Sequence, residues 1–302
     1  MNEKYKQKVE LLIRLIPLVA ENNVFAIHGG TAINLFVRNM PRGSIDIDLT
    51  YIPLENREES LLHINENLES ISRRAKSVFP GIHIIHKSDT CKLLCEYQRN
   101  QIKIEVNLTK RGIVGCDAVR MPLCKKAQEK FRLYCEADIV PLTLLYGGKM
   151  AAALSRQHPR DLFDIRYMEY PLEKTREGFL FCILGSDRPL YESFSPTLLD
   201  QRATLMNQFE GMTEIDFTYQ DFEETRAKLI ADVNNLLTDD DKAFLVSFEN
   251  ADPDWNHFEF GYFKDYPSIR WKLQNLLKLK KSNPKKLIAE AEKLQKHFFC
   301  HQ

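Results

Sequence analysis

Two aspartates that alternate with apolar residues, Asp46 and Asp48, carry the strongest chemical signal in this sequence of 302 residues. Successive side chains of a strand project to opposite faces. In an expected strand from Ile45 to Ile52, both carboxylates therefore lie on one face, while Ile47 and Leu49 face the core. Magnesium prefers a few carboxylates completed by water and phosphate oxygens. Two aspartates alone often mark only a solvent-facing strand edge, but together with the glycine turn that precedes them they predict a site for a divalent metal bound with nucleotide phosphates.

A glycine turn precedes this strand, in the segment His28-Gly29-Gly30-Thr31. The apolar run from Val24 to Ile27 predicts a strand that leads into the turn. A helix is expected from Thr31 to Val37, with Thr31 as its N-cap. Backbone N–H groups at a helix start attract phosphate, and glycines allow close approach. The turn is therefore a candidate phosphate site; His28 beside it could touch a nucleotide or simply pack.

A third carboxylate, Glu105, is expected from a neighbouring strand. Residues 55–78 predict a long helix, and residues 82–86, 92–97 and 102–108 predict strands, the last two joined by a hairpin at 99–101. In the last strand Lys103 and Glu105 share the face opposite the apolar residues. Glu105 could complete a carboxylate trio, and Lys103 could contact phosphate or pair with Glu105. A mixed sheet with flanking helices results.

Two helices, expected at 141–156 and 160–167, carry later polar candidates. Lys149 lies on the first, and Asp161 and Asp164 lie three apart on the second, so the two acids share a face. A surface lysine and an Arg160/Asp161 capping or salt-bridge pair are the structural alternatives. Further helices are expected at 197–209, 219–237, 239–248, 269–279 and 285–299, which predicts a helical C-terminal domain.

Taken together, these motifs resemble those of the AbiE-type toxin nucleotidyltransferases, members of the DNA-polymerase-β-like superfamily. The resemblance covers roughly residues 20–170 and rests on the order of four motifs. They are His28-Gly29-Gly30-Thr31-Ala32, the Arg42-x-Ser44-x-Asp46-Ile47-Asp48 segment, Lys149-Met150-Ala151-Ala152-Ala153 and Arg160-Asp161-Leu162-Phe163-Asp164. The resemblance implies an α/β (α+β) nucleotidyltransferase core over residues 1–170. A helical domain over residues 171–302 would follow and could bind an acceptor or an antitoxin.

The resemblance also implies an activity and a role for each site residue. Such enzymes use a nucleoside triphosphate with Mg²⁺, for which Mn²⁺ is an alternative; some modify the tRNA acceptor end, and a cognate antitoxin is commonly encoded alongside. Asp46, Asp48 and Glu105 would bind the metal, whereas Gly29, Gly30, Thr31 and Ser44 would hold triphosphate oxygens. Lys149 would neutralise phosphate charge. Asp161 would position the nucleotide or transfer a proton, with Asp164 as a second candidate for that role.

Charge is distributed unevenly, although the formal net charge is zero. Residues 169–260 hold 20 acidic and 7 basic side chains, whereas residues 264–297 hold 10 basic and 3 acidic ones. Such basic segments could meet RNA, although a lysine-rich stretch is more often a solvated helix face. The aromatic residues near the basic segment, Trp255, Tyr262, Phe263, Tyr266 and Trp271, could stack on bases or belong to the core.

Composition favours a cytoplasmic location. The seven cysteines form no CxxC pair, the first residues lack the apolar core of a signal peptide, and no uncharged apolar run is long enough to span a bilayer. The sequence thus predicts a cytoplasmic, magnesium-dependent nucleotidyltransferase that acts on an RNA hydroxyl. A nucleotidyltransferase that modifies a protein or small molecule is one alternative, and a catalytically silent nucleotide- or RNA-binding module is another.

Overall fold

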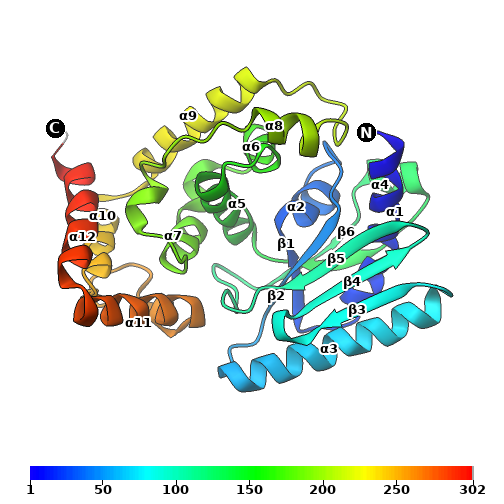
Figure 1. Cartoon of the computed structure of the whole chain (residues 1–302), viewed down its shortest axis with the longest axis horizontal. Helices are drawn as coiled ribbons and strands as arrows, with labels where there is room; N and C mark the ends of the chain where they lie inside the picture. Colours follow the sequence, from blue (N-terminus) through cyan, green and yellow to red (C-terminus); the bar gives the residue numbers. More distant parts are fainter. Residues whose placement is uncertain (301–302) are drawn as a thin grey trace. The chain divides into compact units, whose positions relative to one another are not determined.

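The computed structural model describes residues 1–300, which form two compact units (Figure 1). The first unit contains residues 1–141 and, later in the chain, residues 204–217. The second contains residues 142–203 and the chain from Thr218 onward. The chain therefore first passes from one unit to the other after Pro141, whereas the sequence analysis placed its domain boundary at residue 170. Helices that were assigned to the predicted catalytic domain, and with them Lys149 and Asp161, belong to the second unit.

The first unit is built on a sheet of seven strands, in the order β3-β4-β5-β2-β1-β7-β6. Strand β1 pairs with β7 and β2 pairs with β5 in parallel, and the other neighbours are antiparallel. The sheet is therefore mixed, as predicted. Its strands are β1 (Phe25–His28), β2 (Asp46–Tyr51), β3 (His83–Lys87), β4 (Lys92–Tyr97), β5 (Asn100–Val106), β6 (Val119–Pro122) and β7 (Glu136–Ile139).

Helices α1 (Glu3–Ala20) and α3 (Arg57–Val78) pack against the sheet and against each other. Helix α1 contacts the central strands, and α3 runs along β3 and β4 (Figure 1). The apolar residues of β2 and β5, including Ile47, Leu49 and Ile104, are fully buried, so the alternate face carries the polar residues. A short helix α4 (Lys125–Phe131) lies between β6 and β7 in sequence.

A turn and a helix start in this unit differ from their predictions. Strands β4 and β5 pair Tyr97 with Asn100, so the hairpin turn consists of Gln98 and Arg99, not of residues 99–101. Both turn residues have positive φ, 50° and 64°, which is the backbone conformation of a two-residue type I′ hairpin turn. The helix after β1 begins at Gly29, two residues earlier than predicted: α2 (Gly29–Ala32) continues into a π-helical turn, Ile33–Val37.

The second unit is a bundle of helices, as predicted for the C-terminal part of the chain. Residues 197–201, however, are not helical, because side chains bind their backbone: Gln157 donates to the Thr197 carbonyl and Arg226 to the Leu199 carbonyl, both at 2.7 Å. A short α8 (Arg202–Thr204) and a π-helical turn, Leu205–Phe209, follow. The longer helices are α5 (Leu142–Arg156), α6 (Pro159–Arg166), α7 (Arg176–Leu184), α9 (Tyr219–Leu236), α10 (Asp239–Glu249), α11 (Pro267–Ser282) and α12 (Pro284–Phe299).

Two glycines let α5 and α7 approach within backbone contact. A Cβ at Gly147 would lie 2.2 Å from the backbone nitrogen of Phe179, and a Cβ at Gly178 would lie 2.1 Å from the Thr143 carbonyl oxygen. Neither neighbour can move away, because both are backbone atoms of buried helices. This contact explains why the tandem glycines at 147–148 do not break α5.

We expect Gly147→Ala to destabilise the protein by several kcal/mol, since the new methyl group overlaps the backbone of α7. Gly148→Ala is the matched control. Its Cβ would meet Cys182 Sγ at an ordinary 3.4 Å, so the gain in helix propensity should stabilise the protein by about 0.5–1 kcal/mol. Urea unfolding of both variants measures the difference. Equal stability of the two variants would contradict the packing of α5 on α7.

No helix within residues 1–300 combines the length and the apolar character needed to cross a bilayer.

Candidate active site

The glycine turn, the Arg42–Ser44 loop and the aspartate strand meet in the first unit. Gly29 has a positive φ of 68°, and a Cβ placed there would lie 2.9 Å from Asp48 Oδ2. A Cβ at Gly30 would lie 2.7 Å from Arg42 Nη2 and 3.3 Å from Ser44 Oγ. Any larger side chain would fill this space. The two glycines therefore leave a cradle whose wall consists of a carboxylate, a guanidinium group and a hydroxyl group.

Thr31 fastens this cradle to strand β2 and does not cap a helix. Its buried hydroxyl lies 2.5 Å from the backbone carbonyl oxygen of Asp46, to which it donates, and 2.9 Å from Ser44 Oγ. The N-cap position is His28, whose ring nitrogen Nδ1 instead lies 3.0 Å from Thr50 Oγ1. The predicted capping role of Thr31 was wrong because a tertiary hydrogen bond takes up its hydroxyl.

Asp46, Asp48 and Glu105 share one face of the sheet. In the parallel pairing of β2 with β5, Asp46 lies opposite Lys103 and Asp48 lies opposite Glu105. Side chains at paired positions point the same way. Asp46 and Asp48 are both partly exposed, while Ile47 between them is buried. The predicted alternation along the aspartate strand is thus confirmed.

Two lysines bind the carboxylate of Glu105. Lys103 Nζ donates to Glu105 Oε2 and Lys92 Nζ lies against Oε1, both at 2.6 Å. Burial alone would raise the pKa of Glu105, but the hydrogen bonds from the two lysines lower it below its usual range. Burial alone would lower the pKa of Lys103, but the hydrogen bond to Glu105 and the negative charges of Asp46 and Asp48 raise it. The two lysines and the three carboxylates on this face of the sheet therefore interact electrostatically.

This face offers two carboxylates to a divalent cation, not three. Within residues 1–300 no group of three or more His, Cys, Asp or Glu side chains is arranged to hold a metal. Asp46 and Asp48 do fit Mg²⁺, which completes its shell with water and phosphate oxygens. The backbone of Gly29 lies close to this carboxylate, since a Cβ there would lie 2.9 Å from Asp48 Oδ2. Glu105 could join a metal only after exchanging at least one lysine, so its role as a third ligand stays a prediction.

Arg42 is a residue of this region that the sequence analysis did not assign to the site. Its side chain is 4% exposed, and its guanidinium Nη1 donates to the Gly43 carbonyl at 2.8 Å. The guanidinium also lies against Gly30, so it places positive charge at the glycine turn. Its position in the Arg42-x-Ser44-x-Asp46 segment was the signal that could have identified it.

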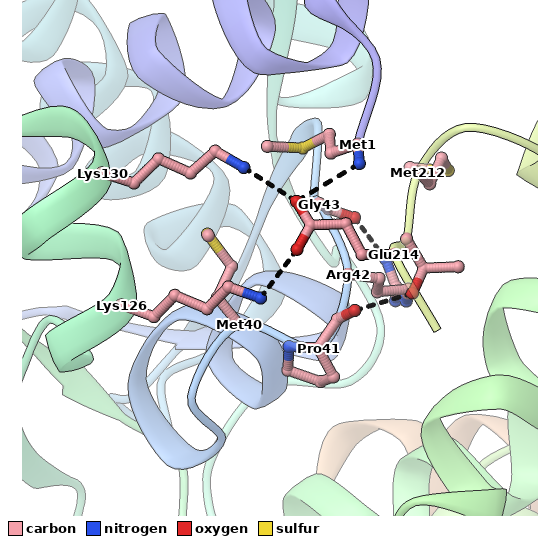
Figure 2. A pocket seen from close by; sticks show the side chains of 10 residues that line it. Met1, Met40, Pro41, Arg42, Gly43, Lys126, Lys130, Met212 and Glu214 are labelled. Carbon is pink, nitrogen blue, oxygen red and sulfur yellow. Dashed lines mark hydrogen bonds and ion pairs between the residues drawn. The ribbon is translucent and has the colours of Figure 1, made fainter. Parts of the chain in front are cut away.

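Residues 204–217, which we call the return segment, form hydrogen bonds with the Arg42–Ser44 loop and with the preceding Pro41. Gly43 N donates to the Met212 carbonyl at 2.7 Å, and Thr213 Oγ1 donates to the Pro41 carbonyl at 2.8 Å. Figure 2 shows the small hollow at this junction, which Met1, Arg42, Gly43 and Met212 help to line. There, hydrogen bonds from Lys130 and Lys126 lower the pKa of Glu214 to about 2. The return segment thus fixes the loop that carries Arg42 and Ser44.

In the second unit, Lys149 lies between two buried aspartates. Lys149 Nζ lies 2.8 Å from Asp161 Oδ1 and 3.0 Å from Asp164 Oδ2, and all three side chains are at least 95% buried. The predicted sharing of one helix face by Asp161 and Asp164 is therefore confirmed. Lys149 is not the surface lysine that was considered as an alternative. It joins α5 to α6 through a charged cluster.

Arg156 completes this cluster from the end of α5. Its Nε donates to Asp161 Oδ2 at 2.5 Å and its Nη2 to Oδ1 at 3.0 Å, a bidentate pair. Burial alone would raise the pKa of Asp161, but the charge of Lys149 and the hydrogen bond from Arg156 lower it far below its usual value. Asp161 is thus an ionised acid, which suits a positioning role better than proton transfer at neutral pH.

The predicted site residues accordingly fall into two groups. The first unit holds Gly29, Gly30, Thr31, Ser44, Asp46, Asp48 and Glu105 around one cradle, and the second holds Lys149, Asp161 and Asp164 in one buried cluster. Each group is assembled within its own unit.

Comparisons with solved structures indicate the fold. MenT4, a nucleotidyltransferase toxin from Mycobacterium tuberculosis, matches with a TM-score of 0.61 at 13% identity, over 91% of this chain and 93% of that chain. A tRNA-processing enzyme in its apo form aligns over 95% of this chain and 80% of that chain, at 11% identity and a TM-score of 0.25, which is too low to indicate a shared fold. No curated protein sequence matches the chain significantly. The match to MenT4 confirms the predicted mixed sheet with flanking helices and the helical C-terminal region.

A family model gives the stronger result, because it matches most of the chain. The model describes the nucleotidyl transferase AbiEii toxin of type IV toxin–antitoxin systems, and it matches residues 10–275. The match includes both the cradle with its aspartate strand and the Lys149 cluster. The chain belongs to the AbiEii family of nucleotidyltransferase toxins of type IV toxin–antitoxin systems.

Proposed function

We propose that this toxin transfers a nucleotide from a Mg²⁺-bound nucleoside triphosphate to a hydroxyl of RNA, with the 3′ end of tRNA as the preferred acceptor. The observation that carries the proposal is the approach of Gly29 to Asp48, since a Cβ placed at Gly29 would lie 2.9 Å from Asp48 Oδ2, which sets the proposed phosphate-binding turn beside the proposed metal ligand. Membership of the family implies a triphosphate substrate and a cognate antitoxin. We propose the cytoplasm as the place of reaction.

The reaction forms a bond between the acceptor oxygen and the α-phosphorus, and it breaks the bond between that phosphorus and the bridging oxygen of the β-phosphate. Pyrophosphate leaves, and the acceptor hydroxyl loses its proton. A bound magnesium ion would neutralise the phosphate oxygens and lower the pKa of the attacking hydroxyl. Asp46 and Asp48 would hold it, with Mn²⁺ as an alternative ion.

The remaining residues would bind and orient the triphosphate. The backbone N–H groups at Gly29 and Gly30 open helix α2, and Arg42 adds positive charge beside them. Thr31 and Ser44 hold the loop on strand β2 through their mutual hydrogen bond, which keeps the cradle in shape. Glu105 is proposed as a third ligand that exchanges lysine for metal when the triphosphate binds.

From the family motifs, Lys149 and Asp161 are also proposed to serve the reaction, Lys149 by neutralising phosphate charge. Within their own unit, Asp161 positions Lys149 and Arg156, and Asp164 also pairs with Lys149. Ion pairs of 2.5–3.0 Å support the positioning role of Asp161, because they fix Lys149 and Arg156 in one orientation.

RNA is favoured as the acceptor by the basic segment near the C-terminus, which holds 10 basic and 3 acidic residues over 264–297. A protein or small-molecule acceptor is the alternative within the enzyme class, since the same metal site could serve any hydroxyl. The acidic segment over residues 169–260 is proposed to have a separate role, the docking of a basic antitoxin.

The acceptor is tested by incubating the protein with Mg²⁺, a triphosphate labelled on the α-phosphate, and total cellular RNA or total cellular protein in separate reactions. We expect label at the 3′ end of an RNA fraction, and sequencing of that fraction identifies the acceptor and the added base. Label found in protein or in small molecules, with none in RNA, would contradict the proposed acceptor. Each of the four common triphosphates is supplied in turn to determine the base preference.

A further inference from the structure

Helix α11 (Pro267–Ser282), in the second unit, carries five basic residues and no acidic residue. Two of the five donate hydrogen bonds to backbone carbonyl groups of this chain. The buried Lys272 Nζ donates to the Arg188 carbonyl at 2.5 Å, and Lys280 Nζ donates to the Asn250 carbonyl at 3.3 Å. The other three, Arg270, Lys278 and Lys281, are exposed.

These three residues lie on one side of the helix. At 100° per residue, the buried residues Ile269, Lys272 and Leu276 mark the inward face, and the exposed residues mark the opposite one. We call the exposed face the α11 stripe. It consists of Arg270, Trp271, Gln274, Leu277, Lys278 and Lys281. Its length from Arg270 to Lys281 is about 16 Å, roughly that of five stacked nucleotides.

The cations of the α11 stripe lack acidic partners, unlike Lys228 and Arg176 in the same unit. Lys228 pairs with Asp232 at 2.6 Å, and Arg176 pairs with Asp241 at 2.7 Å. Within residues 1–300, neither Arg270, Lys278 nor Lys281 forms an ion pair. Three uncompensated charges on one helix face create a local positive potential that suits a polyanion.

Trp271 sits within this positive face and is 45% exposed. The other aromatic residues near the basic segment are engaged elsewhere. Trp255 packs against Phe244 with its ring tilted, Tyr266 is buried against Phe181, and the Tyr262 hydroxyl donates to Glu177. Of the aromatic residues named in the sequence analysis, Trp271 therefore offers the ring face for stacking.

We infer that the α11 stripe binds a single-stranded segment of RNA, with a base stacked on Trp271 and phosphates held by Arg270, Lys278 and Lys281. This inference rests on the proposed function in one respect, because it takes the RNA to be the acceptor. The positive charge of the stripe favours a polyanion such as RNA. The exposed indole of Trp271 favours an unpaired strand, because bases in a duplex present no free face for stacking.

Binding of a fluorescent single-stranded RNA to the full-length protein, followed by anisotropy with a metal chelator and without triphosphate, tests the inference. Trp271→Ala is expected to weaken binding about tenfold, whereas Trp271→Phe keeps most of the affinity because it keeps a stacking ring. Lys278→Ala/Lys281→Ala should lower the slope of log affinity against log salt by about 1.4, the value for two phosphate contacts.

The matched control is Lys76→Ala/Lys87→Ala, which removes two exposed lysines from the first unit. It should bind RNA as the wild type does. Equal affinity and equal salt slope for the α11 variants and the wild type would overturn the inference. So would a wild-type protein that binds no RNA but binds an acidic protein through the stripe.

The same measurement separates this inference from the proposed function. If the wild type binds RNA through the stripe but transfers no nucleotide to it, the proposed acceptor is wrong and the inference stands. If transfer to RNA occurs while the stripe variants bind RNA normally, the inference is wrong and the acceptor stands.

Discussion

Replacing Asp46 or Asp48 with Asn is expected to lower the rate of nucleotide transfer by at least about 10³-fold, because each change removes a charge from the pair that holds magnesium. Both side chains are partly exposed on the polar face of β2, so the protein should remain folded. Rates are compared at saturating triphosphate, and circular dichroism checks the fold. Excess Mn²⁺, which binds nitrogen and oxygen ligands more tightly than Mg²⁺, should restore part of the activity.

Asp138→Asn is the matched control for these variants. Asp138 stands on β7 of the same sheet and pairs with Arg120 at 3.3 Å, so its replacement removes one strand aspartate outside the cradle. We expect less than a twofold change in rate. An Asp48→Asn enzyme as active as Asp138→Asn would contradict the assignment of Asp48 to the metal.

Replacing Lys149 with Met should have the largest effect on stability among the site variants. The change removes Lys149 from between Asp161 and Asp164, while Arg156 stays bound to Asp161, and breaking a buried ion pair costs about 3–5 kcal/mol. Lys228→Met is the matched control, since Lys228 is 73% exposed and its ion pair with Asp232 should contribute less than about 1 kcal/mol. Urea unfolding at neutral pH measures both variants.

The dependence of this stability on pH checks the charged state of the cluster. The pKa of Asp161 is lower in the folded protein than in the unfolded chain, so its contribution is complete above about pH 4 and is lost as pH falls through the folded value. Between about pH 6 and about pH 3, the wild type should therefore lose more stability than Asp161→Asn. Parallel losses in the two proteins would contradict a charged Asp161.

The strands around the site could be predicted because their patterns are local. Strand β4 occupies the predicted residues 92–97, and burial of Ile102, Ile104 and Val106 follows the predicted alternation. Residues 111–137 showed no clear pattern because β6 and β7 have four residues each and α4 has seven. Such elements are specified by distant pairing, as in the parallel contact of Ile27 with Ile139.

In the candidate site, residue types could be predicted from the sequence but their partners could not. The glycine turn and the aspartate strand indicated phosphate and metal, and the approach of Gly29 to Asp48 agrees with that pairing. The binding of Glu105 by Lys92 depends on the register of β4 with β5, which no local pattern specifies. The buried position of Lys149 likewise depends on how α6 packs against α5.

Nucleotidyl transfer at the Asp46/Asp48 face is tested most directly by supplying RNA, Mg²⁺ and triphosphate labelled on either the α- or the γ-phosphate. We predict that the wild type incorporates the α-label into RNA and releases the γ-label as pyrophosphate, and that Asp46→Ala/Asp48→Ala incorporates neither. Incorporation of the γ-label would indicate phosphoryl transfer. Equal incorporation of the α-label by the wild type and the double variant would contradict the assignment of the reaction to this face.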